Sequence, residues 1–180
     1  MNLDDLIDTA RLVPRDEPFD WEGAEQQLGL QVPEDFRRLV DAGGSGLWFD
    51  YIRVFAPGER DPSRNLLQSD GVFRDLLIFW EDDPDTRPTD LPQGDVRLIA
   101  WANTANGEML FWRVEPGASP DTYPIYVEDA DGEEWERFDM TTTEFLRGLL
   151  RGDVTSSFFS DIFLRTDRVF QAYADLQSEG

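Results

Sequence analysis

Hydrophobic residues occupy both parities of two neighbouring segments, Val96–Ala102 and Met109–Val114. A strand with one wet face alternates apolar and polar residues, so this pattern predicts two central strands that are buried on both faces. Regular alternation gives each face of the first strand its own set of side chains: Leu98, Ala100 and Ala102 on one, Ile99 and Trp101 on the other. Asn106-Gly107 lies between the segments and favours a tight reversal, because glycine accepts a positive φ without steric cost.

A second strand pair is predicted over Tyr123–Glu128 and Trp135–Asp139, joined through Asp131-Gly132. Pro124 has no N–H to donate to a neighbouring strand, so this pair is placed nearer an edge of the sheet. An earlier strand is predicted over Leu47–Phe55, where aromatic residues share one parity.

Helical spacing of apolar residues predicts helices before and after these strands in the sequence. Asp20 and Gly29 punctuate one of them as N-cap and stop signal, and Thr141 with Glu144 forms a capping box at the start of another. The predicted helices cover Asp4–Val13, Trp21–Leu28, the segment from Pro33 to Gly43-Gly44, Arg64 to about Leu77, and Thr141 to Gly152. The aromatic tail after Gly152 is expected to form one or two more.

The elements together predict an α+β fold: a central, mostly antiparallel sheet of about four to six strands, flanked by N-terminal and C-terminal helices. Residues 1–180 fit one domain, with 153–180 as a helical C-terminal extension. The first residues contain no apolar run typical of a signal peptide, and no stretch approaches the roughly 20 apolar residues of a membrane span. A cytoplasmic protein is therefore expected.

Three residue types with common chemical roles are missing from the chain. It has no His, no Cys and no Lys, so the usual neutral-pH base, disulfides and Schiff-base chemistry are excluded. Three acids, Asp129, Asp131 and Glu134, are spaced like part of a calcium loop, but the twelve-residue ligand pattern is incomplete and a hairpin turn is the favoured interpretation. No cofactor-binding or metal-binding site and no catalytic residue is assigned.

The net charge of −22 argues against a partner that presents phosphates, which excludes nucleic acid and anionic membranes. It suits either a well-solvated surface or the fast capture of a basic protein partner. The sequence carries no signal for the oligomeric state.

Acidic residues concentrate in two segments, 81–95 and 128–139. If both lie on one side of the sheet, they form a negative surface that imitates a row of phosphates and could plug a basic cleft. The alternative is two solvated turns. The candidate partner-binding residues are Glu81, Asp82, Asp83, Asp85, Glu128, Asp129, Asp131, Glu133 and Glu134.

Two stretches carry a resemblance to a known family. The first, LGLQVPEDFRRLVDAGGSG, contains Leu28, Gly29, Val32, Pro33, Asp35, Phe36, Leu39, Gly43, Gly44 and Gly46. The second, LIAWANTANGEMLFWRVE, has an apolar strand, an Asn-Gly turn and another apolar strand, and is followed by YPIYV, Trp135, Phe138 and Phe145-Leu146. In this order the motifs resemble the SUKH superfamily, the Smi/Knr-type cell-wall-regulator-like domains, over roughly residues 19–152.

The resemblance implies an α+β domain without a catalytic site. Bacterial members of that family are commonly immunity proteins that neutralise a toxin domain, often a nuclease, and fungal relatives are interaction modules. The expected function is therefore an immunity protein that binds a basic toxin domain. A regulatory or scaffolding module without a toxin partner is the alternative, and a hydrolase that uses carboxylates alone ranks last because His and Cys are missing.

Overall fold

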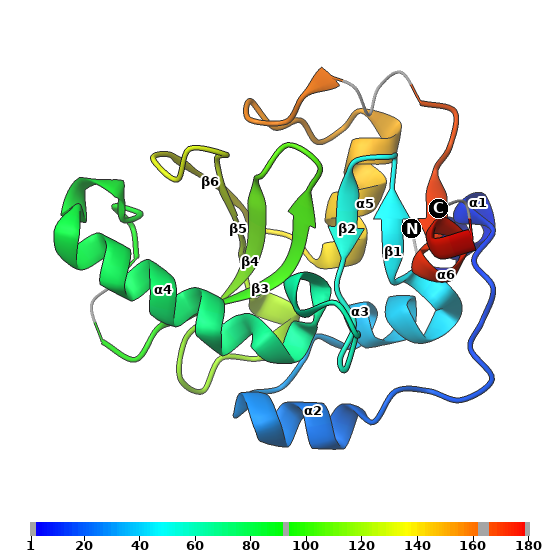
Figure 1. The fold of residues 1–180 in the computed structure, drawn as a ribbon, viewed down its shortest axis with the longest axis horizontal. Helices are drawn as coiled ribbons and strands as arrows, with labels where there is room; N and C mark the ends of the chain where they lie inside the picture. Colours follow the sequence, from blue (N-terminus) through cyan, green and yellow to red (C-terminus); the bar gives the residue numbers. More distant parts are fainter. Residues whose placement is uncertain (1–2, 92–93, 162–165, 179–180) are drawn as a thin grey trace.

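The computed structural model describes residues 3–91, 94–161 and 166–178 of an α+β domain built on one antiparallel sheet (Figure 1). The sheet has seven strands in the order β6-β5-β4-β3-β2-β1-β7. The strands are β1 Gly46–Trp48, β2 Ile52–Val54, β3 Arg97–Thr104, β4 Met109–Val114, β5 Ile125–Glu128, β6 Trp135–Phe138 and β7 Phe170–Ala172. The predicted fold class is thus confirmed, with more strands than expected.

Helices lie on both faces of the sheet. α1, α3 and α5 contact one another, and α3 and α5 pack their aromatic side chains on one face of β3 and β4. α4 crosses β3 on the near side in Figure 1. The helices are α1 Leu3–Ala10, α2 Trp21–Leu28, α3 Glu34–Leu39, α4 Ser69–Asp82, α5 Thr142–Arg151 and α6 Tyr173–Ser178.

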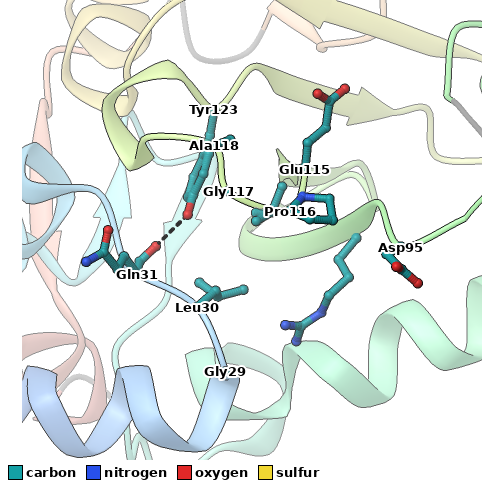
Figure 2. A pocket seen from close by; sticks show the side chains of 11 residues that line it. Gly29, Leu30, Gln31, Asp95, Glu115, Pro116, Gly117, Ala118 and Tyr123 are labelled. Carbon is teal, nitrogen blue, oxygen red and sulfur yellow. Dashed lines mark hydrogen bonds between the residues drawn. The ribbon is translucent and has the colours of Figure 1, made fainter.

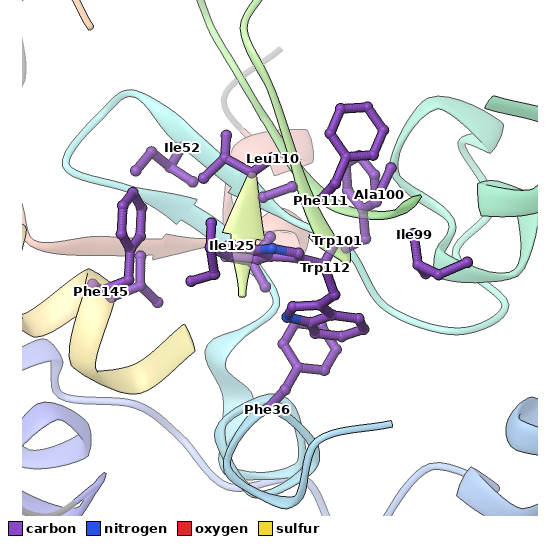
Figure 3. Close-up of a cluster of buried hydrophobic side chains, with 14 of the residues drawn as sticks. Phe36, Ile52, Ile99, Ala100, Trp101, Leu110, Phe111, Trp112, Ile125 and Phe145 are labelled. Carbon is purple, nitrogen blue, oxygen red and sulfur yellow. The ribbon is translucent and has the colours of Figure 1, made fainter. Parts of the chain in front are cut away.

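An aromatic cluster fills the interior between β3–β4 and the helices α3 and α5 (Figure 3). Phe36 lies edge-on to Trp112 with ring centroids 4.8 Å apart, and Trp101 stacks on Trp112 at 6.2 Å. Phe145 from α5 meets the other side of Trp101. All four side chains are buried, which confirms β3 and β4 as central strands.

The predicted alternation along β3 holds only as far as Trp101. Ala100 pairs with Phe111, but Ala102 pairs with Leu110, so two residues of β3 face one residue of β4. This β-bulge at Trp101 reverses the alternation. Ala102 therefore joins the face of Leu110 and does not share a face with Ala100, contrary to the prediction.

The single strand predicted over Leu47–Phe55 is two strands, β1 and β2, that form a hairpin. Phe49 and Asp50 both have a positive φ, 56° and 54°, and turn the chain between them. Neither is a glycine, so the usual sequence signal for this conformation is missing.

The helix predicted over 64–77 begins and ends later than expected. Short 3-10 turns occupy Pro62–Arg64 and Leu66–Gln68, and α4 then runs from Ser69 to Asp82. The Asp61 side chain caps the first of these 3-10 turns by accepting a hydrogen bond from the Ser63 N–H. Because α4 extends further, Glu81 and Asp82 belong to the helix and not to the predicted loop.

The C-terminal extension is not wholly helical. Phe170–Ala172 forms β7, which pairs with β1 at the edge of the sheet, and the residues that follow it form the helix α6. Strand pairing satisfies the free N–H and C=O groups of the β1 edge, which outweighs the amphipathic pattern of the tail. Two hydrophobic residues of the tail on which the helical prediction relied, Ile162 and Phe163, lie outside the described residues.

Candidate functional site

Two tryptophans connect the two acidic segments. Trp80 near the end of α4 and Trp135 at the start of β6 lie edge to face with ring centroids 6.0 Å apart. The indole Nε1 of Trp135 also donates a hydrogen bond of 2.7 Å to the carbonyl of Thr86, in the 3-10 turn Pro84–Thr86 that follows α4. The chain after α4 therefore lies against the β5–β6 hairpin, on the α4 side of the sheet.

Asp90 holds the rest of this loop on the sheet. Its Oδ2 accepts hydrogen bonds from the Tyr126 hydroxyl at 2.8 Å and from Arg137 Nη1 at 3.2 Å. Burial opposes ionisation of Asp90, but these two donors outweigh it and keep the pKa of the carboxyl below its ordinary value. Asp90 is thus an ionised structural anchor, although it belongs to the acidic 81–95 segment.

Seven of the nine candidate partner-binding residues are exposed, and we refer to them together as the acidic surface. We use this name for Glu81, Asp82, Asp83, Asp85, Asp131, Glu133 and Glu134. In the described parts of the chain, none of these seven takes part in an ion pair. The neighbouring cations are engaged, since Arg137 pairs with Asp90 and Asp139 and Arg87 lies 5.2 Å from the centre of the Trp80 ring. The negative charge of the surface is therefore not neutralised locally.

The two remaining candidates, Glu128 and Asp129, are partly buried. Asp129 accepts hydrogen bonds from the backbone N–H groups of Glu133 and Glu134, at 2.7 and 3.1 Å, and so closes the β5–β6 turn. Burial, with a smaller contribution from the charge of Asp129, raises the pKa of Glu128 to about 7. These two acids support the hairpin and contribute little to the exposed acidic surface.

The outer side of α4 carries an apolar feature that sequence reasoning missed. Leu77, Ile78 and Phe79 are 41%, 56% and 46% exposed, and we call these three residues the α4 ridge. The signal was available in the uninterrupted hydrophobic run from Leu76 to Trp80, because one face of a helix cannot bury five consecutive side chains. Ending the predicted helix at Leu77 concealed it.

A pocket of about 370 Å³ lies between the end of α2, the start of β3 and the connection from β4 to β5 (Figure 2). Several of its polar groups already have partners within the protein. The Tyr123 hydroxyl donates a hydrogen bond of 3.0 Å to the Gln31 carbonyl, and Arg97 pairs with Asp70. Burial raises the pKa of Tyr123, which keeps its hydroxyl protonated. The pocket thus lacks a convergent set of free reactive groups among these residues.

Glu108 is a fully buried carboxylate on the β3–β4 hairpin. One oxygen accepts from the Tyr51 hydroxyl at 2.7 Å and the other from the Thr104 hydroxyl at 2.6 Å. These bonds join the hairpin to the turn between β1 and β2, which gives Glu108 a structural role. Among the residues that the structure describes, no group of three or more Asp and Glu side chains is arranged to hold a metal ion.

No family model, curated protein or solved structure matches the chain in the comparisons. A search of the helices in the described ranges finds none with both the length and the apolar character to span a membrane. The acidic surface and the α4 ridge are therefore interpreted from their own chemistry.

Proposed function

We propose that this protein is a non-catalytic binding module, an immunity protein that binds and neutralises a basic toxin domain in the cytoplasm. The observation that carries the proposal is that two acidic segments, distant in the sequence, meet through Trp80 and Trp135 on one side of the sheet. The resemblance to the SUKH superfamily supports the class of function, and the uncompensated charge supports the choice of a basic partner.

The acidic surface has the properties that electrostatic capture requires. Its carboxylates are exposed and form no ion pair with the cations of the described residues, so their field extends into solvent. A surface of this kind raises the association rate with an oppositely charged protein by about 10- to 1,000-fold, and the effect weakens as salt is added. Bound in a cationic cleft, such as that of a nuclease, the same carboxylates would occupy the positions of substrate phosphates.

Co-expression with a toxin domain encoded by a neighbouring gene tests the proposal. The protein is expected to restore growth and to bind the purified toxin domain. Replacing the α4 end of the surface with neutral residues, as Glu81→Gln, Asp82→Asn, Asp83→Asn and Asp85→Asn, is expected to slow association about 10-fold or more at low salt. The melting temperature should not fall, because these four side chains form no ion pair in the described parts of the chain.

A matched control removes the same charge elsewhere, as Asp8→Asn, Asp16→Asn, Glu17→Gln and Glu22→Gln, all exposed in the N-terminal part of the chain. This variant should associate at nearly the wild-type rate. Equal slowing by both variants would assign the effect to net charge and remove the acidic surface from the interface. Failure of the wild-type protein to bind or protect would contradict the immunity function and favour the regulatory module.

A further inference from the structure

The α4 ridge exposes hydrophobic area that the fold leaves uncovered. Phe73, Leu76 and Trp80 face the sheet and pack in the core, whereas the ridge residues point away from it. Figure 1 shows α4 on the near side of the molecule, and no other described element passes over its outer side. Exposed apolar clusters of this kind are typical of sites that bind another protein.

The surroundings of the ridge are acidic. Helical geometry places residues three and four positions apart side by side, so Ile78 has Asp75 on one side and Glu81 and Asp82 on the other. The carboxylates at the C-terminal end also oppose the helix dipole, and the last turn has no basic residue to offset them. Neither the exposed apolar side chains of the ridge nor the acids at the C-terminal end of α4 stabilise the isolated fold. Local choices that lower stability are expected where a surface serves a function.

We propose that the α4 ridge is the docking site for a cationic, amphipathic segment of the partner protein. Apolar side chains of that segment cover Leu77, Ile78 and Phe79, and its Lys or Arg side chains pair with the acids on either side. The inference rests on the proposed partner-binding function. It identifies the α4 ridge as the apolar part of that binding interface. In such interfaces a central apolar group supplies most of the affinity and a charged rim sets the rate and specificity.

Charge complementarity selects this occupant over a second copy of the chain. Packing two α4 helices through their ridges would bring Asp75, Glu81 and Asp82 of both copies together, with Arg74 as the cation on this side of the helix. Like charges in contact oppose association. A cationic segment removes the same hydrophobic area from water and neutralises the acids at once.

The test uses a defined probe, a helical peptide of about 18 residues, or five turns, with Leu on one face and Lys on the other. Its affinity is measured for the wild-type protein and for the triple variant Leu77→Ala, Ile78→Ala, Phe79→Ala. Alanine keeps the helix propensity of α4, and circular dichroism checks that the variant is folded. We expect at least about 10-fold weaker binding by the triple variant. A Lys peptide with Ala in place of Leu should bind weakly and equally to both proteins.

Val13→Ala is the matched control, because Val13 is 80% exposed and lies outside α4. It should bind the peptide like the wild-type protein. Peptide affinity of the triple variant within about twofold of wild type would overturn the inference. A wild-type dimer in analytical ultracentrifugation that the triple variant lacks would also overturn it, by assigning the ridge to self-association.

The toxin assay separates this inference from the proposed function. If the triple variant protects cells as well as the wild-type protein does, the immunity function stands and the ridge is not its anchor. If the wild-type protein fails to bind the toxin domain but binds the peptide through the ridge, the immunity function is wrong and the docking site stands. Loss of both protection and peptide binding in the folded triple variant supports both the immunity function and the docking site on the α4 ridge.

Discussion

At the residue scale, Glu128 shows how folding changes the chemistry of a single carboxyl group. Its backbone pairs with Met109 on one side and Trp135 on the other, and its side chain is partly buried among them on the α4 face. In the described parts of the chain, no hydrogen-bond donor or cation compensates for the lost water. The charged form is therefore disfavoured, and the pKa rises from 4.5 to about 7.

The raised pKa predicts a defined pH dependence. Because the folded state holds the proton more tightly than the unfolded state, the stability that Glu128 contributes is fully present below pH 4.5 and is lost as pH rises through about 7. Glu128→Gln should therefore raise the free energy of unfolding at pH 8 by about 1–3 kcal/mol and change it little at pH 4.5. Urea unfolding of both proteins at the two pH values measures the difference.

The same substitution at Glu133, an exposed neighbour in the β5–β6 turn, serves as the control. Glu133→Gln should leave the pH dependence of stability close to that of the wild-type protein. If Glu128→Gln changed the free energy of unfolding equally at both pH values, burial would not raise the pKa of the Glu128 carboxyl.

At the scale of elements, one hydrogen bond joins two helices that are distant in the sequence. The Asp35 carboxylate in the first turn of α3 accepts a bond of 2.8 Å from the backbone N–H of Thr143, in the first turn of α5. That N–H has no partner within its own helix, so Asp35 acts as a cap supplied from outside. The bond fixes α5 against α3 above the aromatic cluster.

Asp35→Ala should therefore lower the free energy of unfolding by about 1–2 kcal/mol, because it leaves the buried end of α5 unsatisfied. Chemical denaturation measures the loss. Glu34→Ala is the matched control, since Glu34 is an exposed acid in the same helical turn and shares the dipole contribution of Asp35 without the bond to α5. Equal losses in both variants would assign the effect to the helix dipole.

Element boundaries were predictable where the signals are local. Asp20 caps α2 through the Gly23 N–H, Gly29 ends it with a φ of 71°, and Thr141 with Glu144 forms the expected capping box of α5. α4 has no such marker, since no side chain caps its first turn at Gln68. Its start is set by contact with the sheet, where the Ser69 hydroxyl donates to the carbonyl of Ala100. Local patterns cannot report that contact.

The candidate site was predictable in its parts and not in its assembly. The acidic residues are visible in the sequence, but the Trp80–Trp135 contact that joins the two segments links residues 55 positions apart. The pattern also could not distinguish the acids of the acidic surface from Asp90, which accepts hydrogen bonds from Tyr126 and Arg137, or from Glu128, which is partly buried. Those roles depend on which donors the fold brings nearby.

At the scale of the whole molecule, the net charge of −22 acts on the fold itself. The ion pairs of the described residues are mostly at the surface, where each contributes little. Mutual repulsion among the remaining carboxylates is then expected to oppose the compact state more than these pairs support it.

Added salt should therefore stabilise the protein. At about 0.01 M ionic strength the Debye length is about 30 Å, whereas near 0.15 M it is about 8 Å, so the repulsion is screened first over long distances. We expect the melting temperature to rise by about 2–8 °C between these conditions, which corresponds to about 1–2 kcal/mol for a domain of this size. Calorimetry in sodium chloride measures the shift. A fall in melting temperature would mean that specific ion pairs outweigh the repulsion.

The pairing of β7 with β1 has a consequence for how the protein is made. Gly46 of β1 faces Ala172 of β7, so the strand partner of this segment is made 126 residues later. Until then one border of the sheet has open backbone groups, and contacts this distant along a chain form slowly. The sheet can be completed only after residues 170–172 have left the ribosome, which makes the nascent chain a natural client for factors that shield unpaired strands.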